Sequence, residues 1–151
     1  MVRFVSISTF RRRLAELLKV KRGAYSGAPN EVCLAFKDAS IEQIRMNRDM
    51  ILMNNDVVVI KLRLPDKRQR LSKADGYRLI YLVMKQLPLV VLLDIYPKRG
   101  PSQQLDIDDK EIDRLLREFV TEMQEERLVE HDILDGLNVI PAPSEDNIED
   151  S

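Results

Sequence analysis

The chain has 151 residues, 44% of them hydrophobic and 32% charged, which is typical of one globular domain with a core of its own. Its longest apolar run, residues 87–93, is far shorter than the roughly 20 residues of a membrane-spanning helix. The start at residues 1–4 also lacks the apolar region of a secretory signal. One cysteine, Cys33, excludes an internal disulfide framework and a multi-cysteine metal site. We therefore expect a cytoplasmic protein without a transmembrane segment.

Charge is divided unevenly along the chain. Residues 1–99 hold 20 Lys and Arg against 9 Asp and Glu, whereas residues 100–151 hold 4 against 16. The first part therefore carries about +11 and the second about −12, behind a net charge of −1. A body this basic attracts polyanions, nucleic acid above all. The sequence leaves open whether the acidic part is a solvated surface or folds back over the basic part.

The first third of the chain predicts one strand followed by helices. Residues 2–6 are predicted as a strand, and Ser8 or Thr9 is expected to cap a helix that ends before Gly23. Residues 30–53 are predicted to be mainly helical, with the pair Ser40 and Gln43 as a capping box. Within that segment, the stretch 31–36 is also compatible with an extended conformation.

The remaining pattern predicts a small sheet and a final helix. Residues 57–64, 77–84 and 89–96 are predicted as strands, and the short connector between the last two predicts an antiparallel hairpin. A helix capped by Asp108 is expected to extend to about residue 132. The predicted fold class is α+β: a small, mainly antiparallel sheet packed on two N-terminal helices, plus a C-terminal helix. Residues 1–132 would form the domain and residues 133–151 an acidic, disordered tail.

Few of the usual catalytic motifs are present. The chain has no glycine-rich phosphate loop, no metal-ligand spacing and no nucleophile elbow, so no cofactor or metal is expected. His131 lies in an acidic segment and is expected to be an exposed surface histidine. Cys33 is expected to be a small buried hydrophobe.

Cations on the predicted strands form the most informative pattern. Alternate residues of a strand share a face, so Lys61 and Arg63 should point away from the apolar side chains between them. Arg78 begins the next strand, and Lys98 and Arg99 follow the last one. The connecting loop adds further cations, namely Lys67, Arg68, Arg70 and Lys73. We expect one antiparallel sheet to gather these groups on a concave, basic face.

Three segments of this region then carry a specific resemblance. They are Ile60-Lys61-Leu62-Arg63, Gly76-Tyr77-Arg78-Leu79-Ile80-Tyr81 and Asp94-Ile95-Tyr96-Pro97-Lys98-Arg99. The chain resembles the RelE family of bacterial type II toxin–antitoxin toxins over about residues 57–118, and agrees with it elsewhere in the order of elements only. The resemblance implies a small sheet on helices, cleavage of messenger RNA in the ribosomal A site, translation arrest and neutralisation by an antitoxin protein. It thus names the antitoxin, the ribosome and messenger RNA as partners.

The resemblance also assigns site residues. The family's basic strand position falls on Lys61, its core arginine on Arg78, and its arginine after the last strand on Arg99, beside Lys98. RNA cleavage through the 2′-hydroxyl needs a base and stabilisation of a phosphorane. Lysine can supply the first, and arginine can grip a phosphate with two donors. We expect Lys61 to be the base, Arg78 and Arg99 the clamps and Lys98 their support. The remaining cations should bind backbone phosphate: Arg63, Lys67, Arg68, Arg70 and Lys73.

Two departures from the family leave alternatives open. A second strand lysine of the family is replaced by Val59, and a tyrosine after the last arginine by Leu105, for which Tyr96 or Tyr81 would have to substitute. One alternative is a non-catalytic module that binds RNA or an antitoxin on the same fold. A second is a gyrase-directed toxin similar to ParE.

The acidic part suggests a further hypothesis. Its 16 carboxylates would fold over the basic face and hold it closed, and deleting residues 133–151 should then raise RNA affinity and steepen its salt dependence. The alternative is that these charges only keep a basic protein soluble.

Overall fold

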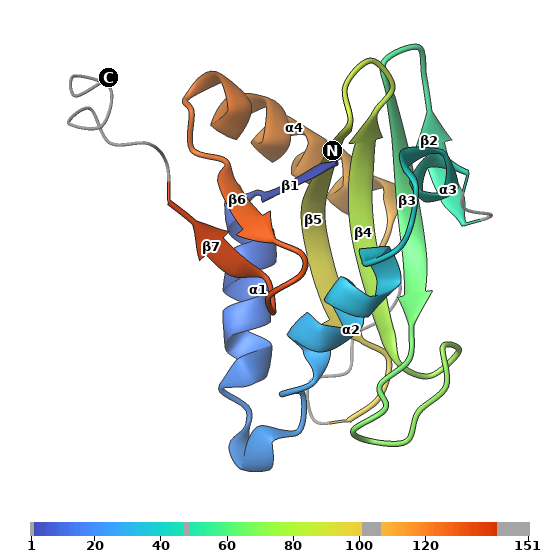
Figure 1. Cartoon of the computed structure of the whole chain (residues 1–151), viewed down its shortest axis with the longest axis vertical. Coiled ribbons are helices and arrows are strands. Elements are labelled where there is room, and N and C mark those ends of the chain that lie inside the picture. The colour runs from blue at the N-terminus through green and yellow to red at the C-terminus, as the bar shows by residue number, and fades with distance from the viewer. Residues whose placement is uncertain (1, 47–48, 101–106, 142–151) are drawn as a thin grey trace.

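The computed structural model describes residues 2–46, 49–100 and 107–141 and shows an α+β fold around one sheet (Figure 1). The sheet has seven strands in the order β2-β3-β4-β5-β1-β6-β7. Their bounds are β1 (Arg3–Ser6), β2 (Met50–Met53), β3 (Val57–Leu64), β4 (Tyr77–Met84), β5 (Leu89–Pro97), β6 (Val129–Asp132) and β7 (Asn138–Ile140). Strands β1 and β5 run parallel and all other neighbours antiparallel, so the sheet is mostly antiparallel, as predicted.

Helices cover both faces of the sheet. Their bounds are α1 (Ser8–Leu18), α2 (Ala28–Phe36), α3 (Ile41–Arg45) and α4 (Asp109–Gln124), and the short 3-10 turn η1 (Lys21–Gly23) follows α1. One core cluster joins the sheet to α1 and α2 through residues such as Phe10 and Phe36. A second cluster joins the other face to α4 through Ile112, Leu115 and Phe119. The molecule therefore has three layers, with the sheet in the middle (Figure 1).

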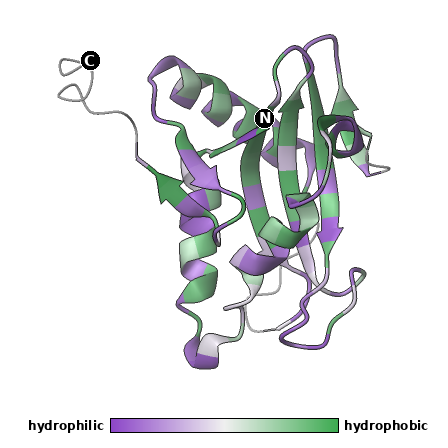
Figure 2. Ribbon diagram, in the orientation of Figure 1, coloured by the Kyte–Doolittle hydropathy of each residue, from purple (hydrophilic) through white to green (hydrophobic). Residues whose placement is uncertain are grey.

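The central strands carry apolar side chains on both faces, which explains why helices cover both faces of the sheet. In β5, Val90 and Leu92 enter the first core, whereas Val91 and Leu93 enter the second. Figure 2 shows this pattern as nearly continuous hydrophobic colour along β4 and β5. Burial on both faces is typical of a central strand that is apolar on both sides, as residues 90–93 are.

The segment after α2 differs from the prediction. The capping box at Ser40 and Gln43 is present and starts α3, but this helix ends at Arg45. Residues 50–53 form β2, an edge strand that pairs antiparallel with β3, so the prediction of helix up to residue 53 was wrong. Strand β2 is defined by its pairing with a later strand, and spacing within the segment does not reveal such a partner.

The C-terminal part also differs. Asp108 caps α4 as predicted, but the helix ends at Gln124 and does not reach residue 132. Strands β6 and β7 follow as a hairpin added to β1, and Leu137 in its turn is buried. Residues 133–141 thus belong to the fold, while residues 142–151 of the predicted tail lie outside the described residues. Within the described ranges, the helices are all too short or too polar to cross a membrane.

Candidate functional site

The strand register places the predicted cations on one face of the sheet. In one row, Lys61 of β3 pairs with Ile80 of β4, which pairs with Asp94 of β5. In the neighbouring row, Arg63 pairs with Arg78, which pairs with Tyr96. Directly opposed residues of antiparallel strands share a face. Two neighbouring rows therefore cross β3, β4 and β5 toward one end of the sheet. The expectation that Lys61, Arg63 and Arg78 share a face is confirmed.

That face is not the open basic surface that the sequence predicted. Most of it is apolar, contributed by side chains such as Val59, Leu82 and Val91, and it packs against α4 in the second core cluster. Only the end of the face that holds the two rows is charged. The prediction of a concave basic face was therefore wrong. The apolar residues that share this face with the cations are buried against α4.

Arg78 is buried and donates hydrogen bonds to backbone carbonyls. Its side chain is only 6% exposed, and its guanidinium donates to the carbonyl oxygens of Lys73 at 2.9 Å, Ala74 at 2.8 Å and Tyr77 at 3.2 Å. These carbonyls lie at the end of the β3–β4 loop and the start of β4. The buried guanidinium therefore fixes how the basic loop leaves the sheet.

Lys61 lies beside acidic residues of α4. A pocket of about 320 Å³ is lined by Lys61 together with Asp109 and Asp113 from the first two turns of the helix, and by apolar residues of β2 and α4. Two carboxylates, rather than further cations, are therefore the charged neighbours of Lys61 in this pocket. The acidic part of the chain reaches the predicted site here, through the start of α4.

The remaining predicted cations gather at the end of the sheet where β3 and β5 stop and β4 begins. The amide of Lys98 donates to the carbonyl of Gly76 at 2.9 Å, and the guanidinium of Arg99 pairs with Asp75 of the β3–β4 loop at 3.0 Å. We call the exposed and half-exposed cations at this place the basic end: Lys67, Arg68, Arg70, Lys73, Lys98 and Arg99. The structure thus brings the loop cations and the cations after β5 together.

The two tyrosines considered as substitutes lie on opposite faces. The hydroxyl of Tyr81 donates to the carbonyl of Ile44 at 2.9 Å in the first core, away from the cations. Tyr96 lies in the row of Arg63 and Arg78, and its hydroxyl accepts a hydrogen bond from the amide of Ile107 at 3.3 Å. Tyr96 alone shares the face of the cations, although it is buried. Leu105 lies outside the described residues.

A second polar cluster was missed by the sequence analysis. His131 is only 6% exposed, so the prediction of a surface histidine was wrong. Its Nε2 lies 2.7 Å from the hydroxyl of Ser6 and its Nδ1 2.8 Å from the carbonyl of Leu137. Arg11 donates to the same Ser6 hydroxyl at 3.0 Å and lies 3.7 Å from the carboxylate of Glu122. Burial lowers the pKa of His131.

The carboxylates of α4 in this cluster cap another helix. Both oxygens of buried Glu122 accept from the amide of Ser8, at 3.0 and 3.1 Å. Glu118 accepts from the amide and the hydroxyl of Thr9, at 2.9 and 2.8 Å. Helix α1 begins with no side-chain cap of its own, so α4 supplies the acceptors that its free amides need. The sequence held a signal for this, because Glu122 lies on the apolar stripe of α4, three residues after Phe119.

Asp94 is a buried carboxylate within the rows of the candidate site. It is fully buried; its Oδ1 accepts from the amide of Ile95 at 2.8 Å and lies 3.5 Å from Nε of Arg13, while its Oδ2 accepts no hydrogen bond within the described residues. Burial raises the pKa of Asp94 to about 6. Asp94 was quoted in the resemblance but was not assigned a role.

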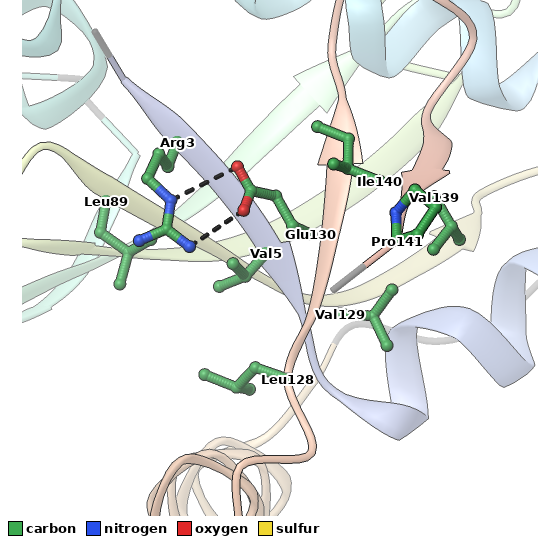
Figure 3. A pocket seen from close by; sticks show the side chains of 9 residues that line it. All are labelled: Arg3, Val5, Leu89, Leu128, Val129, Glu130, Val139, Ile140 and Pro141. Atoms are coloured by element: carbon green, nitrogen blue, oxygen red, sulfur yellow. Dashed lines mark hydrogen bonds and ion pairs between the residues drawn. The ribbon is translucent and has the colours of Figure 1, made fainter. Parts of the chain in front are cut away.

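A mainly apolar pocket near the β6–β7 hairpin contains none of the predicted site residues. It measures about 400 Å³ and is lined by β1, β5, the segment after α4 and the β6–β7 hairpin. Figure 3 shows the ion pair of Arg3 and Glu130 at 2.9 Å on one side, with Val129, Val139 and Ile140 around the rest. The guanidinium of Arg3, which lines this pocket, is paired with Glu130.

Comparison with known proteins adds no assignment. A scan against protein-family models finds no match to this chain, and a search of curated proteins finds none either.

Proposed function

We propose that this protein is a RelE-like toxin of a type II toxin–antitoxin system that binds messenger RNA on the ribosome and cleaves it, arresting translation. The observation that carries the proposal is the placement of the cations. Lys61, Arg63 and Arg78 lie in adjacent rows of one face, and those rows end beside the basic end.

In this proposal each cation has a separate task. Lys61 removes the proton from the 2′-hydroxyl, which then attacks the adjacent phosphate, and the bond from that phosphate to the 5′-oxygen of the next nucleotide breaks. The leaving 5′-oxygen takes up a proton from water, and the products are a 2′,3′-cyclic phosphate and a free 5′-hydroxyl. Exposed Arg99, with Lys98 beside it, stabilises the charge that develops on the phosphate oxygens. Arg63 and the loop cations bind neighbouring phosphates. Arg78, whose guanidinium is occupied by carbonyls, is a positioning residue for the basic loop.

A second candidate function rests on a specific observation. The pocket beside Lys61 is lined by Asp109 and Asp113, whose negative charge opposes the approach of a phosphate to this lysine. A chain in which these carboxylates stay in place would bind RNA or an antitoxin through the basic end without cleaving the RNA. This second candidate is a non-catalytic binding module on the same fold.

A cell-free translation assay tests the proposal. Addition of the purified protein should arrest synthesis of a reporter, and Lys61→Met and Arg99→Gln should each reduce the arrest by at least about a hundredfold, the range expected for loss of a general base or a charge-stabilising group. Arg12→Gln, which removes an exposed cation of α1 that belongs neither to the rows of Lys61 and Arg63 nor to the basic end, is the control and should arrest like wild type. Arrest that persists in both site variants would contradict the assignment of these residues. Absence of arrest by wild type would favour the binding module.

A further inference from the structure

The chain presents a basic surface without any exposed aromatic ring. It has four Tyr, four Phe and no Trp, all within the described residues, and each of these eight side chains is at most 5% exposed. Proteins that recognise single-stranded RNA commonly stack unpaired bases on aromatic side chains. That mode has no aromatic platform on this surface, which favours recognition through contacts to phosphates and sugars.

The tip of the β3–β4 loop is a small hairpin closed by backbone hydrogen bonds. Residues 66–71, which we call the tip hairpin, are closed by backbone hydrogen bonds in both directions between Asp66 and Leu71, at 3.0 and 2.9 Å. Two buried carboxylates hold the turn from below: Glu31 accepts from the amide of Lys67 at 2.8 Å, and Asp66 accepts from the amide of Gln69 at 3.3 Å. The backbone amides are thus used internally, and the three cationic side chains of the turn face solvent.

A second cationic segment is attached to this hairpin. The guanidinium Nε of Arg68 donates to the carbonyl of Gly23 in η1 at 2.9 Å, and the hydroxyl of Tyr25 donates to the carbonyl of Arg99 at 3.0 Å. The turn η1 contributes exposed Lys21 and Arg22. In Figure 1 the η1 turn and the β3–β4 loop lie at the same end of the molecule. Hydrogen bonds therefore join two cationic segments, distant in sequence, into one surface.

We propose that η1, the tip hairpin and the end of β5 form a docking surface for the phosphate backbone of a base-paired nucleic acid. In a double helix the bases are stacked on one another and the phosphates face outward, so a protein needs no aromatic platform to bind it. Cations on two segments that are joined by hydrogen bonds suit phosphates held in the regular array of a duplex. The choice of duplex RNA as the ligand rests on the proposed function, in which the ribosome supplies base-paired RNA beside the messenger.

Binding without ribosomes tests this inference separately from cleavage. The probes are an RNA duplex of about 16 base pairs, a length that duplex-binding domains span, one of its strands alone, and a DNA duplex of the same sequence. The duplex should bind the full chain at least about tenfold more tightly than the single strand. Equal or tighter binding of the single strand would overturn the proposal. A DNA duplex that binds as tightly as the RNA duplex would support recognition of phosphates alone, whereas weaker DNA binding would support recognition of RNA geometry.

Matched variants locate the surface. Lys67→Gln with Arg70→Gln, and separately Lys21→Gln with Arg22→Gln, should each weaken duplex binding about tenfold or more and lower the slope of log affinity against log salt by about 2. Arg12→Gln with Arg117→Gln, exposed cations of α1 and α4, removes the same charge elsewhere and should leave the slope unchanged.

An equal loss of affinity in all three double variants would show a general charge effect and overturn the assigned surface. Duplex binding in a protein that does not arrest translation would preserve this inference while rejecting the proposed function. Translation arrest by a protein that shows no preference for the duplex would support the proposed function and reject this inference.

Discussion

Arg78 illustrates how a buried arginine can hold the backbone of a loop. An arginine presents five donors in a fixed planar arrangement, and here two of its nitrogens reach carbonyls on both sides of the turn into β4. Lysine has a single ammonium and reaches fewer of these acceptors. The identity of this residue is thus explained by the loop it holds, whether or not RNA is cleaved.

We therefore expect Arg78→Lys to lower the free energy of unfolding by about 1–3 kcal/mol, the range for leaving buried polar groups unsatisfied. Its cross-strand neighbour Arg63 is exposed, and Arg63→Lys should change stability by less than about 0.5 kcal/mol. Urea unfolding of the two variants measures both effects. Similar losses in the two variants would contradict a structural role for Arg78.

Asp94 and His131 give opposite dependences of stability on pH. The pKa of Asp94 is raised to about 6 in the fold by burial, so the folded state takes up a proton that the unfolded chain, with an ordinary pKa near 3.9, does not. Stability from this group is therefore gained as the pH falls from above 6 to about 4. The pKa of His131 is lowered by burial, so protonation below pH 6.5 costs stability.

The variant Asp94→Asn should consequently be more stable than wild type at pH 7.5, by up to about 3 kcal/mol, and should lose stability more steeply as the pH falls from 6.5 to 4. Unfolding in urea across this pH range provides the measurement, and His131→Gln is the companion variant, which should show the opposite change in slope. Parallel profiles for wild type and Asp94→Asn would show that Asp94 is ionised with an ordinary pKa.

At the scale of elements, α4 performs three tasks in this fold. It covers the apolar face of the sheet, its carboxylates cap α1, and its first turns bring Asp109 and Asp113 to the pocket of Lys61. Acidic residues near the end of a helix are unfavourable for that helix's own dipole. Glu118 and Glu122 are compensated because they lie at the positive end of α1.

Removal of this cap should lower the free energy of unfolding. Glu122→Ala leaves the amide of Ser8 without its acceptor and Arg11 without its carboxylate partner, and we expect a loss of about 1–3 kcal/mol in the free energy of unfolding. Glu125→Ala removes an exposed carboxylate that pairs only with Arg127 and should cost less than about 1 kcal/mol. Thermal unfolding of the two variants is the comparison, and equal midpoints would refute capping by α4.

The β6–β7 hairpin changes how the acidic end can be tested. Deleting residues 133–151 would remove β7, buried Leu137 and the acceptor of His131, so the product would be destabilised whatever the tail does. Deletion of residues 142–151 alone removes four carboxylates without these contacts. We expect this shorter deletion to leave the thermal midpoint within about 2 °C of wild type, and a larger drop would show that the segment contributes to the fold.

At the scale of the whole molecule, sequence patterns predicted the local and repetitive features. Strands of β-branched and aliphatic residues, such as 57–64 and 77–84, and the caps at Ser40 and Asp108 follow from short-range signals. Features that depend on distant partners were not predictable in this way. Strand β2 needs β3, the hairpin of β6 and β7 needs β1, and the burial of His131 needs Ser6.

The same division applies to the candidate site. Alternation along β3 correctly placed Lys61 and Arg63 on one face of the sheet. Alternation could not show that α4 would cover that face. Alternation also could not show that Arg78 would donate its hydrogen bonds to backbone carbonyls. The cover by α4 and the hydrogen bonds of Arg78 depend on the paths of a helix and a loop, which the strand pattern does not determine.

The central claim is that this fold cleaves messenger RNA on the ribosome, and it is tested most directly by mapping RNA ends. A messenger is incubated with purified translating ribosomes or alone, in the presence of wild type, Lys61→Met or the control Arg12→Gln, and new 5′ ends are mapped by primer extension. The account predicts cleavage only with ribosomes, by wild type and the control, and loss of cleavage in Lys61→Met. An intact messenger with wild-type protein, under conditions where that protein binds the ribosome, would contradict the account and establish binding without cleavage.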